Sequence, residues 1–351
     1  MADKMKVGMI GLGGISKTHM PGWIDNPYTE IVAGCDVAEA PLLAWSEKYS
    51  IDKVTTKPED LINDPTIDII DICTPNNYHS PLAVAALNAG KHVICEKPLA
   101  PNPAAIQAMI DARDASGKML MTAQHFRFTP HAKAMKAAID TGVLGDIYHA
   151  RSWMLRRAAA PTTPGFILKE HASGGAVIDI GVHILDLTLW FMGNPKAVSV
   201  TGVARSELAH KPGAFSIWGG AIPPMMNVEE FASAFVRFEN GATLVLEVSW
   251  LLHHNTEGED MQMWLYGTEG GSHWPKGEIY QSDYAEKKHI NTTIEKGAAL
   301  REAHAQECFE FSQAIYEGTD SPVPAEQSLE VLTILDGVYR SQEAGGEIKL
   351  R

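Results

Sequence analysis

The chain has 351 residues, a length at which a globular protein typically forms about two domains. Hydrophobic residues make up 45% and charged residues 21%, a composition that excludes disordered and fibrous proteins. The 29 Lys and Arg residues against 43 Asp and Glu residues leave a formal net charge of −14, which repels nucleic acids and anionic membrane surfaces. We therefore expect a protein that binds neither.

Short, uniformly apolar runs alternate with segments of helical spacing from residue 5 to about residue 127. Runs without polar alternation are typical of parallel strands that helices cover on both faces. The segments 78–88 and 103–115 supply such helices. This pattern predicts a doubly wound parallel sheet. Its strands are expected at residues 6–10, 30–35, 67–73, 91–95 and 119–123.

The pattern changes after about residue 128. Helical spacing over 131–141 and a strand-like stretch at 146–155 precede two alternating runs, 231–238 and 242–250. The turn Glu239-Asn240-Gly241 joins these runs and tolerates the positive φ of a tight hairpin. Helical spacing returns over 300–316 and 325–344. We predict two domains, 1–127 and 128–351, the second built on an antiparallel or mixed sheet, with a ligand cleft between them.

Cysteine usage and hydropathy predict the compartment. The four cysteines include no Cys-x-x-Cys pair, which favours reduced, buried thiols in a cytoplasmic protein. The most apolar stretch, 176–193, is interrupted by Asp179, His183 and Asp186, so we expect no membrane span. The first residues lead into a stretch too short and too rich in glycine for a signal peptide.

A glycine-rich turn follows the first predicted strand and opens a helix. Gly11 permits the tight turn, Gly13 lets the backbone approach a pyrophosphate, and the helix N-terminus near Gly14 offers free N–H groups. Ser16 replaces the third glycine of the usual fingerprint, and its small side chain still permits close packing of the helix on the sheet. The turn predicts a dinucleotide site in the segment Gly11-Leu12-Gly13-Gly14-Ile15-Ser16.

Asp36 lies 20 residues beyond Ser16, at the end of the second predicted strand. A carboxylate there can accept hydrogen bonds from both hydroxyls of an adenosine ribose. The same carboxylate would repel a 2′-phosphate, and the following residues Val37 and Ala38 supply no arginine to bind one. The sequence therefore predicts NAD as the cofactor, with NADP disfavoured.

Three residues have the chemistry of alcohol oxidation. Lys97 follows a strand at the sheet edge where ligands bind, so its ammonium could stabilise a developing alkoxide, or it could be a surface lysine beside Glu96. Asp179 and His183 are four residues apart and share one face if their segment is helical. His183 could then take the hydroxyl proton while Asp179 orients it or Lys97. A core histidine or a pair of metal ligands are alternatives, but no third ligand has a recognisable spacing, so we predict no metal.

Together these motifs resemble the glucose-fructose oxidoreductase, inositol dehydrogenase and rhizopine catabolism family, known as Gfo/Idh/MocA. The resemblance extends over nearly the whole chain. It implies a Rossmann domain followed by an α/β domain with a large open, mostly antiparallel sheet, whose exposed face forms homodimers or homotetramers. It further implies that Lys97, Asp179 and His183 are catalytic, with His183 as acid and base. The motifs that carry the resemblance are Gly11-Leu12-Gly13-Gly14, Thr74-Pro75-Asn76 with His79, Glu96-Lys97-Pro98 and Asp179-x-Gly181-x-His183. The resemblance also implies a cofactor site that includes Leu12, Ile15, Thr74, Pro75, Asn76, His79 and Glu96.

Substrate contacts are harder to assign. Salt bridges and core packing are alternative roles for each candidate. The loop 211–227 could form a lid or an interface, and the pair His253-His254 could reach the cleft. The candidates that could bind sugar hydroxyls or stack on a ring are Arg127, Trp153, Arg156 and Arg157.

These features predict an NAD-dependent dehydrogenase that oxidises a secondary alcohol of a sugar, a sugar derivative or an inositol. One alternative is glycoside cleavage or epimerisation assisted by transient oxidation with a retained NAD. A second alternative is a nucleotide-sensing regulator without activity, which the presence of Lys97, Asp179 and His183 together disfavours because a sensor needs only the nucleotide pocket.

Overall fold

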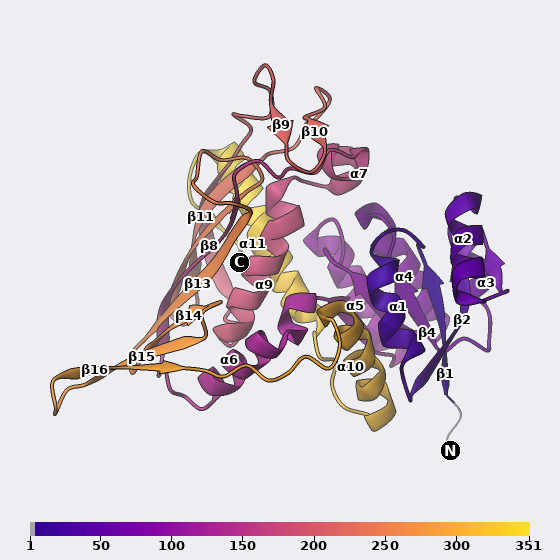
Figure 1. Ribbon diagram of the computed structural model, residues 1–351, viewed down its shortest axis with the longest axis horizontal. Coiled ribbons are helices and arrows are strands. Elements are labelled where there is room, and N and C mark those ends of the chain that lie inside the picture. The colour runs from indigo at the N-terminus through magenta and orange to yellow at the C-terminus, as the bar shows by residue number, and fades with distance from the viewer. Residues whose placement is uncertain (1–3) are drawn as a thin grey trace. The chain divides into compact units, whose positions relative to one another are not determined.

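The computed structural model describes residues 4–351, and the chain divides into two compact units, each built on its own sheet (Figure 1). The first unit combines Met1–Phe128 with Ala299–Leu329, and the second combines Thr129–Ala298 with Glu330–Arg351. The chain therefore returns to the first unit late in the sequence. The domain ranges expected from the sequence, 1–127 and 128–351, are each continuous, and the expectation assigned Ala299–Leu329 to the second domain.

The sheet of the first unit has six strands in the order β3-β2-β1-β4-β5-β6, and all neighbours are parallel. This arrangement confirms the predicted doubly wound fold. The strand order reverses between β1 and β4, and the crevice beyond their carboxyl ends is where this fold binds nucleotides. The strands are β1 (Met5–Ile10), β2 (Thr29–Cys35), β3 (Val54–Thr55), β4 (Ile69–Ile72), β5 (His92–Glu96) and β6 (Leu120–Ala123).

Helices flank this sheet, and local signals set several of their ends. Asn102 begins α5 by accepting a hydrogen bond from the Ala105 N–H at 2.9 Å, and Gly117 ends it with a positive φ of 65°. The helices of the first unit are α1 (Ser16–Ile24), α2 (Glu39–Tyr49), α3 (Pro58–Ile62), η1 (Asn76–Tyr78), α4 (His79–Asn88), α5 (Pro103–Ser116), η2 (His125–Phe128) and α10 (Ala303–Glu317).

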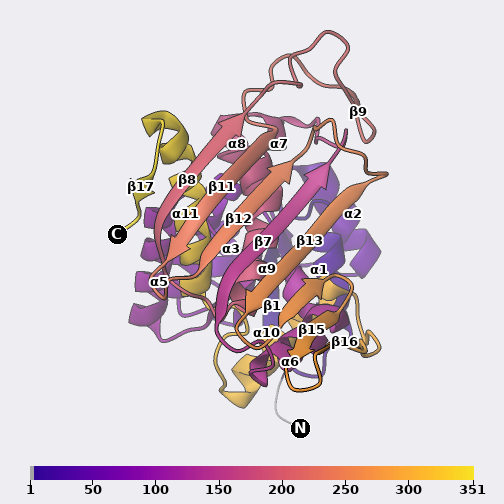
Figure 2. The same cartoon turned by 90° about the vertical axis from the view of Figure 1, so that its left-hand side faces the viewer.

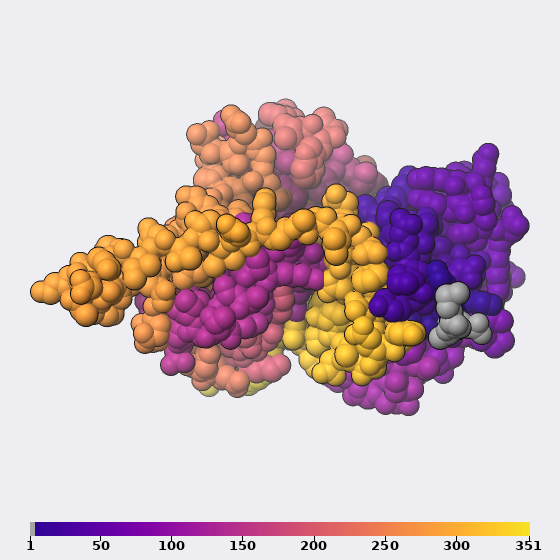
Figure 3. Space-filling view, turned by 60° about the horizontal axis from the view of Figure 1, so that its bottom comes forward, coloured from indigo at the N-terminus to yellow at the C-terminus, as the bar shows by residue number. Residues whose placement is uncertain are grey.

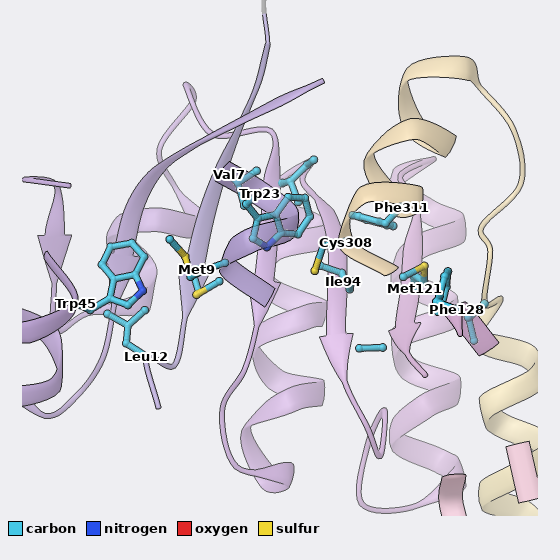
Figure 4. Packing of buried hydrophobic residues seen from close by; sticks show 14 of the residues in the cluster. Val7, Met9, Leu12, Trp23, Trp45, Ile94, Met121, Phe128, Cys308 and Phe311 are labelled. Atoms are coloured by element: carbon cyan, nitrogen blue, oxygen red, sulfur yellow. The ribbon is translucent and has the colours of Figure 1, made fainter. Parts of the chain in front are cut away.

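Helix α10 belongs to the first unit because it packs directly on α1. A side chain at Gly22 would lie 2.4 Å from the carbonyl oxygen of Ala305, so only glycine permits this close approach. Figure 4 shows Cys308 and Phe311 of α10 in the same apolar cluster as Trp23. These side chains are fully buried, and each such burial stabilises the fold by about 1.5–3 kcal/mol.

The second unit contains a nine-stranded sheet in the order β16-β15-β14-β13-β7-β12-β11-β8-β17 (Figure 2). Only β7 and β12 pair in parallel, so the sheet is mostly antiparallel, as expected. A separate two-stranded sheet joins β9 and β10. The strands are β7 (Ile147–Arg156), β8 (Ala197–Arg205), β9 (Phe215–Ser216), β10 (Gly220–Ala221), β11 (Phe231–Phe238), β12 (Thr243–Ser249), β13 (Glu259–Gly267), β14 (Gly271–Trp274), β15 (Glu278–Asp283), β16 (Lys288–Thr293) and β17 (Ile348–Lys349).

The helices α9 and α11 lie on one face of this large sheet (Figure 1). The segment Lys169–Phe191 is apolar and long enough to cross a membrane, but 89% of its most apolar window is buried inside the protein, as in a core helix. The helices are α6 (Pro130–Asp140), α7 (Pro164–Ile167), α8 (Lys169–Ala172), a π-helical turn η3 (Val177–Gly181), α9 (Val182–Phe191) and α11 (Ala325–Ala344), which begins in the first unit.

Among residues 4–351, no helix lies on the other face of the nine-stranded sheet (Figure 2). The alternating burial of β11 and β12 shows this directly, because every second residue is buried and the residues between are half-buried or exposed. The ribbon of β15 and β16 stands out from the sheet, in orange in Figure 3, and every residue of β16 is exposed.

Candidate active site

The glycine-rich turn follows β1 at the strand-order reversal. Gly11 has a φ of +92°, and a side chain there would lie 2.6 Å from the Cys73 carbonyl oxygen, so the turn requires glycine. A side chain built at Gly13 or Gly14 would meet nothing within 4 Å, so the backbone there faces open space. Ser16 is fully buried and donates a hydrogen bond to the Gly13 carbonyl at 2.8 Å. The serine thus braces the turn, and its small side chain is fully enclosed.

Asp36 is tied to this turn. Its Oδ2 accepts the Leu12 N–H at 2.8 Å, and its Oδ1 accepts the Ala38 N–H at 2.9 Å. These bonds hold the carboxylate, half-buried, at the carboxyl end of β2 beside the glycine-rich turn. The open space over Gly13 and a carboxylate held at this point fit a dinucleotide, whose pyrophosphate would lie on the N–H groups at the start of α1 and whose ribose would meet Asp36.

The loops after β4 and β5 are joined through His79. Its side chain is fully buried, with Nδ1 2.8 Å from the Pro98 carbonyl oxygen and Nε2 2.7 Å from the Thr74 carbonyl oxygen. Burial lowers the pKa of His79 below its usual value. The structure therefore places His79 behind the two loops as a brace. Thr74, Pro75 and Lys97 lie in the loops that it joins.

Glu96, the last residue of β5, sits in a buried network with His19. The Oε2 of Glu96 accepts the Lys97 N–H at 2.9 Å, and its Oε1 lies 3.0 Å from His19 Nε2. The other ring nitrogen of His19 lies 3.0 Å from Asp71 Oδ2, which also accepts the Trp23 indole N–H at 2.7 Å. Lys97 itself is half-buried at the carboxyl end of β5. The network therefore fixes the backbone that carries Lys97.

Charges in this network are strongly coupled. Burial acts to lower the pKa of His19, but the acidic groups of Cys308, Cys73 and Asp71 beside it raise that pKa well above its usual value. Burial acts to raise the pKa of Glu96, and the hydrogen bond and charge of His19 lower it below its usual value. We infer a charged imidazolium held between two carboxylates.

The nearby carboxyl of Glu307, on α10, is in a different state. It is fully buried, and neither oxygen has a hydrogen-bond partner among the described residues; its distance to His19 Nε2 is 3.7 Å. Burial raises the pKa of Glu307 well above its usual value, more than His19 lowers it. Sequence reasoning missed this network. The available signal was a charged residue within an apolar run, as at Asp71 in β4.

In the second unit, Asp179 and His183 lie on one continuous helical segment, the π-turn η3 and the helix α9, as their spacing requires. π-turns inside helices are frequent at functional sites. Both side chains are largely buried, with 14% of the Asp179 side chain exposed and 7% of His183. Asp179 Oδ2 accepts the Trp250 indole N–H at 3.1 Å and lies 3.9 Å from Arg156 Nη1.

Glu229 anchors the start of this helical segment. Its carboxylate accepts the N–H groups of Gly175 and Val177, both at 2.9 Å, and the hydroxyl of Tyr339 at 2.9 Å. A side chain at Gly175 would lie 1.9 Å from the Glu229 carbonyl oxygen, which explains the glycine. Burial raises the pKa of Glu229, and these three donors oppose the rise. Glu229 and Trp250 position Asp179, and neither is among the residues that the sequence predicted.

The four predicted substrate residues have different surroundings. Arg156 lies beside Asp179, with its Nε 2.6 Å from Glu259 Oε2. Trp153 lies three residues before Arg156 on β7, and side chains an odd number of residues apart on a strand point to opposite faces of the sheet. Trp153 therefore points to the open face, where its indole N–H donates to Asp260 at 2.8 Å. Arg157 is exposed after β7. Arg127, in the first unit, is buried and donates to Gln327 at 2.5 Å.

His254 also lies on the network of the open face, since its Nε2 is 3.3 Å from the same Asp260 carboxylate. Within the second unit, the structure brings Arg156 to Asp179 and places Trp153 and His254 elsewhere.

Comparison with known proteins agrees with this architecture. Residues 5–124 match the model of the oxidoreductase family with an NAD-binding Rossmann fold, and residues 132–273 match the model of the Gfo/Idh/MocA C-terminal domain. The chain belongs to the Gfo/Idh/MocA family of NAD-binding oxidoreductases, as its motifs indicated.

Individual relatives match over the full length. The D-glucoside 3-dehydrogenase of Escherichia coli (strain K12) is 29% identical over 352 residues, covering 99% of this chain and 98% of the relative. The myo-inositol 2-dehydrogenase of Thermotoga maritima is 27% identical over 361 residues, covering 99% of this chain and 98% of the relative. A solved levoglucosan dehydrogenase, in complex with NADH and levoglucosan, shares the fold with a TM-score of 0.82 at 24% identity, covering 99% of this chain and 100% of that one.

Proposed function

We propose that this protein is an NAD-dependent dehydrogenase that oxidises a secondary alcohol of a sugar, a sugar derivative or an inositol. The observation that carries this proposal is the occurrence, in one chain, of two features. One is a glycine-rich turn with open space over Gly13 and a tethered Asp36, and the other is a buried helix that presents Asp179 and His183. The glucoside and inositol dehydrogenases among the relatives support the substrate class.

Bound NAD would supply the hydride acceptor for the substrate carbon. His183 takes the proton of the substrate hydroxyl, because an imidazole titrates near neutral pH. The ammonium of Lys97 stabilises the negative charge that develops on the oxygen. Asp179, held by the Trp250 indole, orients His183 on the same helical segment. The carbon thus loses a hydride and the oxygen loses a proton, which leaves a ketone.

In this proposal, residues of the first unit determine which dinucleotide the protein binds. Asp36 accepts the ribose hydroxyls and repels a 2′-phosphate, so NAD is preferred over NADP. The loops that contain Thr74, Pro75, Asn76 and Lys97 line the nicotinamide end, and His79 and Glu96 hold them in place.

We also propose a cytoplasmic homodimer or homotetramer. All four cysteines are buried and free, as expected in a reducing compartment. The open face of the large sheet supports self-association, because its half-buried residues include several large apolar side chains. These are Trp153, Phe231, Phe235, Val245, Trp264 and Tyr266.

The test is a substrate screen with methyl glucopyranosides, levoglucosan and myo-inositol, with either NAD or NADP, read by the appearance of the reduced cofactor's absorbance. We expect NADH to accumulate with at least one of these polyols, and NAD to be preferred over NADP. Product formation without net NADH would instead support transient oxidation in glycoside cleavage or epimerisation. No turnover with any polyol would contradict the proposal.

A further inference from the structure

A long loop, residues 206–228, lies between β8 and β11 and contains the short strands β9 and β10. Glu230, beside the helix anchor Glu229, holds the base of this loop. Its carboxylate accepts the backbone N–H groups of Glu207 at 2.6 Å and Ala209 at 3.0 Å, and the Ser206 hydroxyl at 3.2 Å. Neighbouring glutamates thus anchor both the helix of Asp179 and the loop.

The tip of the loop is hydrogen-bonded to the segment that follows β7. The Ile217 N–H donates to the Ala158 carbonyl at 2.8 Å, and the Ser216 hydroxyl donates to the Ala160 carbonyl at 2.7 Å. Ala159, which lies between these two acceptor residues, donates its N–H to the Trp250 carbonyl at 3.0 Å. The loop tip is therefore hydrogen-bonded to a segment that also bonds to the backbone of Trp250, and the Trp250 indole in turn holds Asp179.

This attachment places the ring of Trp218 close to Asp179, with Arg156 between them. The guanidinium carbon of Arg156 lies 4.6 Å from the centre of the Trp218 ring, and Arg156 Nη1 lies 3.9 Å from Asp179 Oδ2. One guanidinium group thus separates the indole from the carboxylate. Trp218 is 61% exposed, so much of its large apolar surface faces solvent.

An exposed indole one guanidinium away from the buried Asp179 carboxylate has the chemistry of a carbohydrate contact. The axial C–H groups of a pyranose or an inositol ring carry partial positive charge and form an apolar face, which packs against the negative face of an aromatic ring. The hydroxyls around that ring remain available to polar groups. Building on the proposed dehydrogenase function, we propose that Trp218 is a substrate-contact residue that packs against the C–H face of the sugar or inositol ring through the indole face that Arg156 leaves open.

Arg156 then acts as a positioning residue. Its guanidinium is bound by Glu259 on one side and lies against the indole on the other, so it is held in place before substrate arrives. Of the two roles weighed for Arg156 from the sequence, a substrate contact or a salt bridge, the ion pair with Glu259 is the one that the structure contains.

The test compares Trp218→Leu, Trp218→Phe and the control Phe215→Leu, which alters another exposed aromatic side chain of the same loop. The probe is whichever of methyl glucopyranoside, levoglucosan or myo-inositol the wild-type enzyme oxidises fastest. We expect Trp218→Leu to raise KM about five- to tenfold with a smaller change in kcat, Trp218→Phe to lie between, and Phe215→Leu to match the wild type. NAD affinity should be equal in all four proteins.

Equilibrium binding of the same sugars in the presence of NADH separates this inference from the dehydrogenase proposal. Normal oxidation with an unchanged KM in Trp218→Leu would overturn the role of Trp218 and leave the function intact. Sugar binding that is weakened in Trp218→Leu, without NADH formation by the wild type, would support the contact and contradict the function. A change of oligomeric state in Trp218→Leu with an unchanged KM would assign the indole to a subunit interface and overturn the proposal. If no sugar binds the wild type, both proposals fail.

Discussion

Asp36 is held by two backbone N–H groups, yet a carboxylate has further lone pairs for a ribose diol. Asp36→Ala should weaken NAD binding about 10- to 100-fold, since hydrogen bonds to a charged group contribute about 1.5–3 kcal/mol. It should also relax discrimination against NADP, because the repulsion of the 2′-phosphate is lost. Binding titrations with both nucleotides measure the two effects, with the exposed Asp52→Ala as control. An unchanged NAD/NADP preference would remove Asp36 from the ribose site.

His183 is the proposed acid and base. General acid-base catalysis contributes about 10²–10⁴-fold, so His183→Asn should lower kcat by that range with NAD affinity unchanged. Steady-state kinetics on the best polyol and an NAD titration provide the two readouts. Turnover equal to that of the wild type would mean that another group takes the proton.

Glu307 offers a prediction about stability. Its raised pKa means that the folded protein retains a proton that the unfolded chain releases above about pH 4.3. The stability that it contributes is therefore complete below that pH and is lost as the pH rises toward the folded-state pKa. Glu307→Gln has no such proton to lose, so the variant should become more stable relative to the wild type as the pH increases from 5 to 8.

Denaturant unfolding across this pH range tests the expectation, with the exposed Glu317→Gln on the same helix as the control. His19 lies 3.7 Å from Glu307 and its charge lowers the pKa of Glu307, so the measured difference reports the pair. A difference between Glu307→Gln and the wild type that stays constant with pH would show that Glu307 is ionised in the folded protein.

At the scale of elements, the π-turn and α9 depend on Glu229, which lies more than 50 residues from the N–H groups that it accepts. Glu229→Ala leaves those two buried donors and the Tyr339 hydroxyl without their acceptor, at about 1–3 kcal/mol each. We expect it to lower the free energy of unfolding by at least about 3 kcal/mol and to reduce kcat. Tyr339→Phe removes one hydrogen bond and should cost about 1 kcal/mol. Equal losses in the two variants, measured by thermal or denaturant unfolding, would contradict this account.

At the scale of the whole molecule, the open sheet face is the proposed site of self-association. Phe235 lies on this face in β11, which is flanked by β12 and β8. Phe235→Lys should shift the protein to a smaller assembly, because a charge in an apolar interface must be desolvated. Light scattering measures the mass. Tyr284→Lys, at a side chain 84% exposed between β15 and β16, is the control. A monomeric wild type would exclude the proposed assembly.

Much of this molecule is predictable because its signals are local. Uniformly apolar runs, a glycine-rich turn and an acidic residue at the end of the second run are properties of short segments, and they predicted the doubly wound sheet that the structure contains. The Asn240-Gly241 turn similarly identified the β11–β12 hairpin.

Other features depend on contacts between segments far apart in the chain, which carry no local signal. The return of α10 to the first unit rests on the fit of Gly22 against the Ala305 backbone. The anchoring of Asp179 by Trp250 and the buried partnership of His19 with Glu96 were decided only by the tertiary structure. The sequence alone determined which elements form and which chemistry they carry, because periodicity and backbone preference act within a few residues. Packing decided which side chains meet, because burial and hydrogen bonding join residues without regard to their separation in sequence.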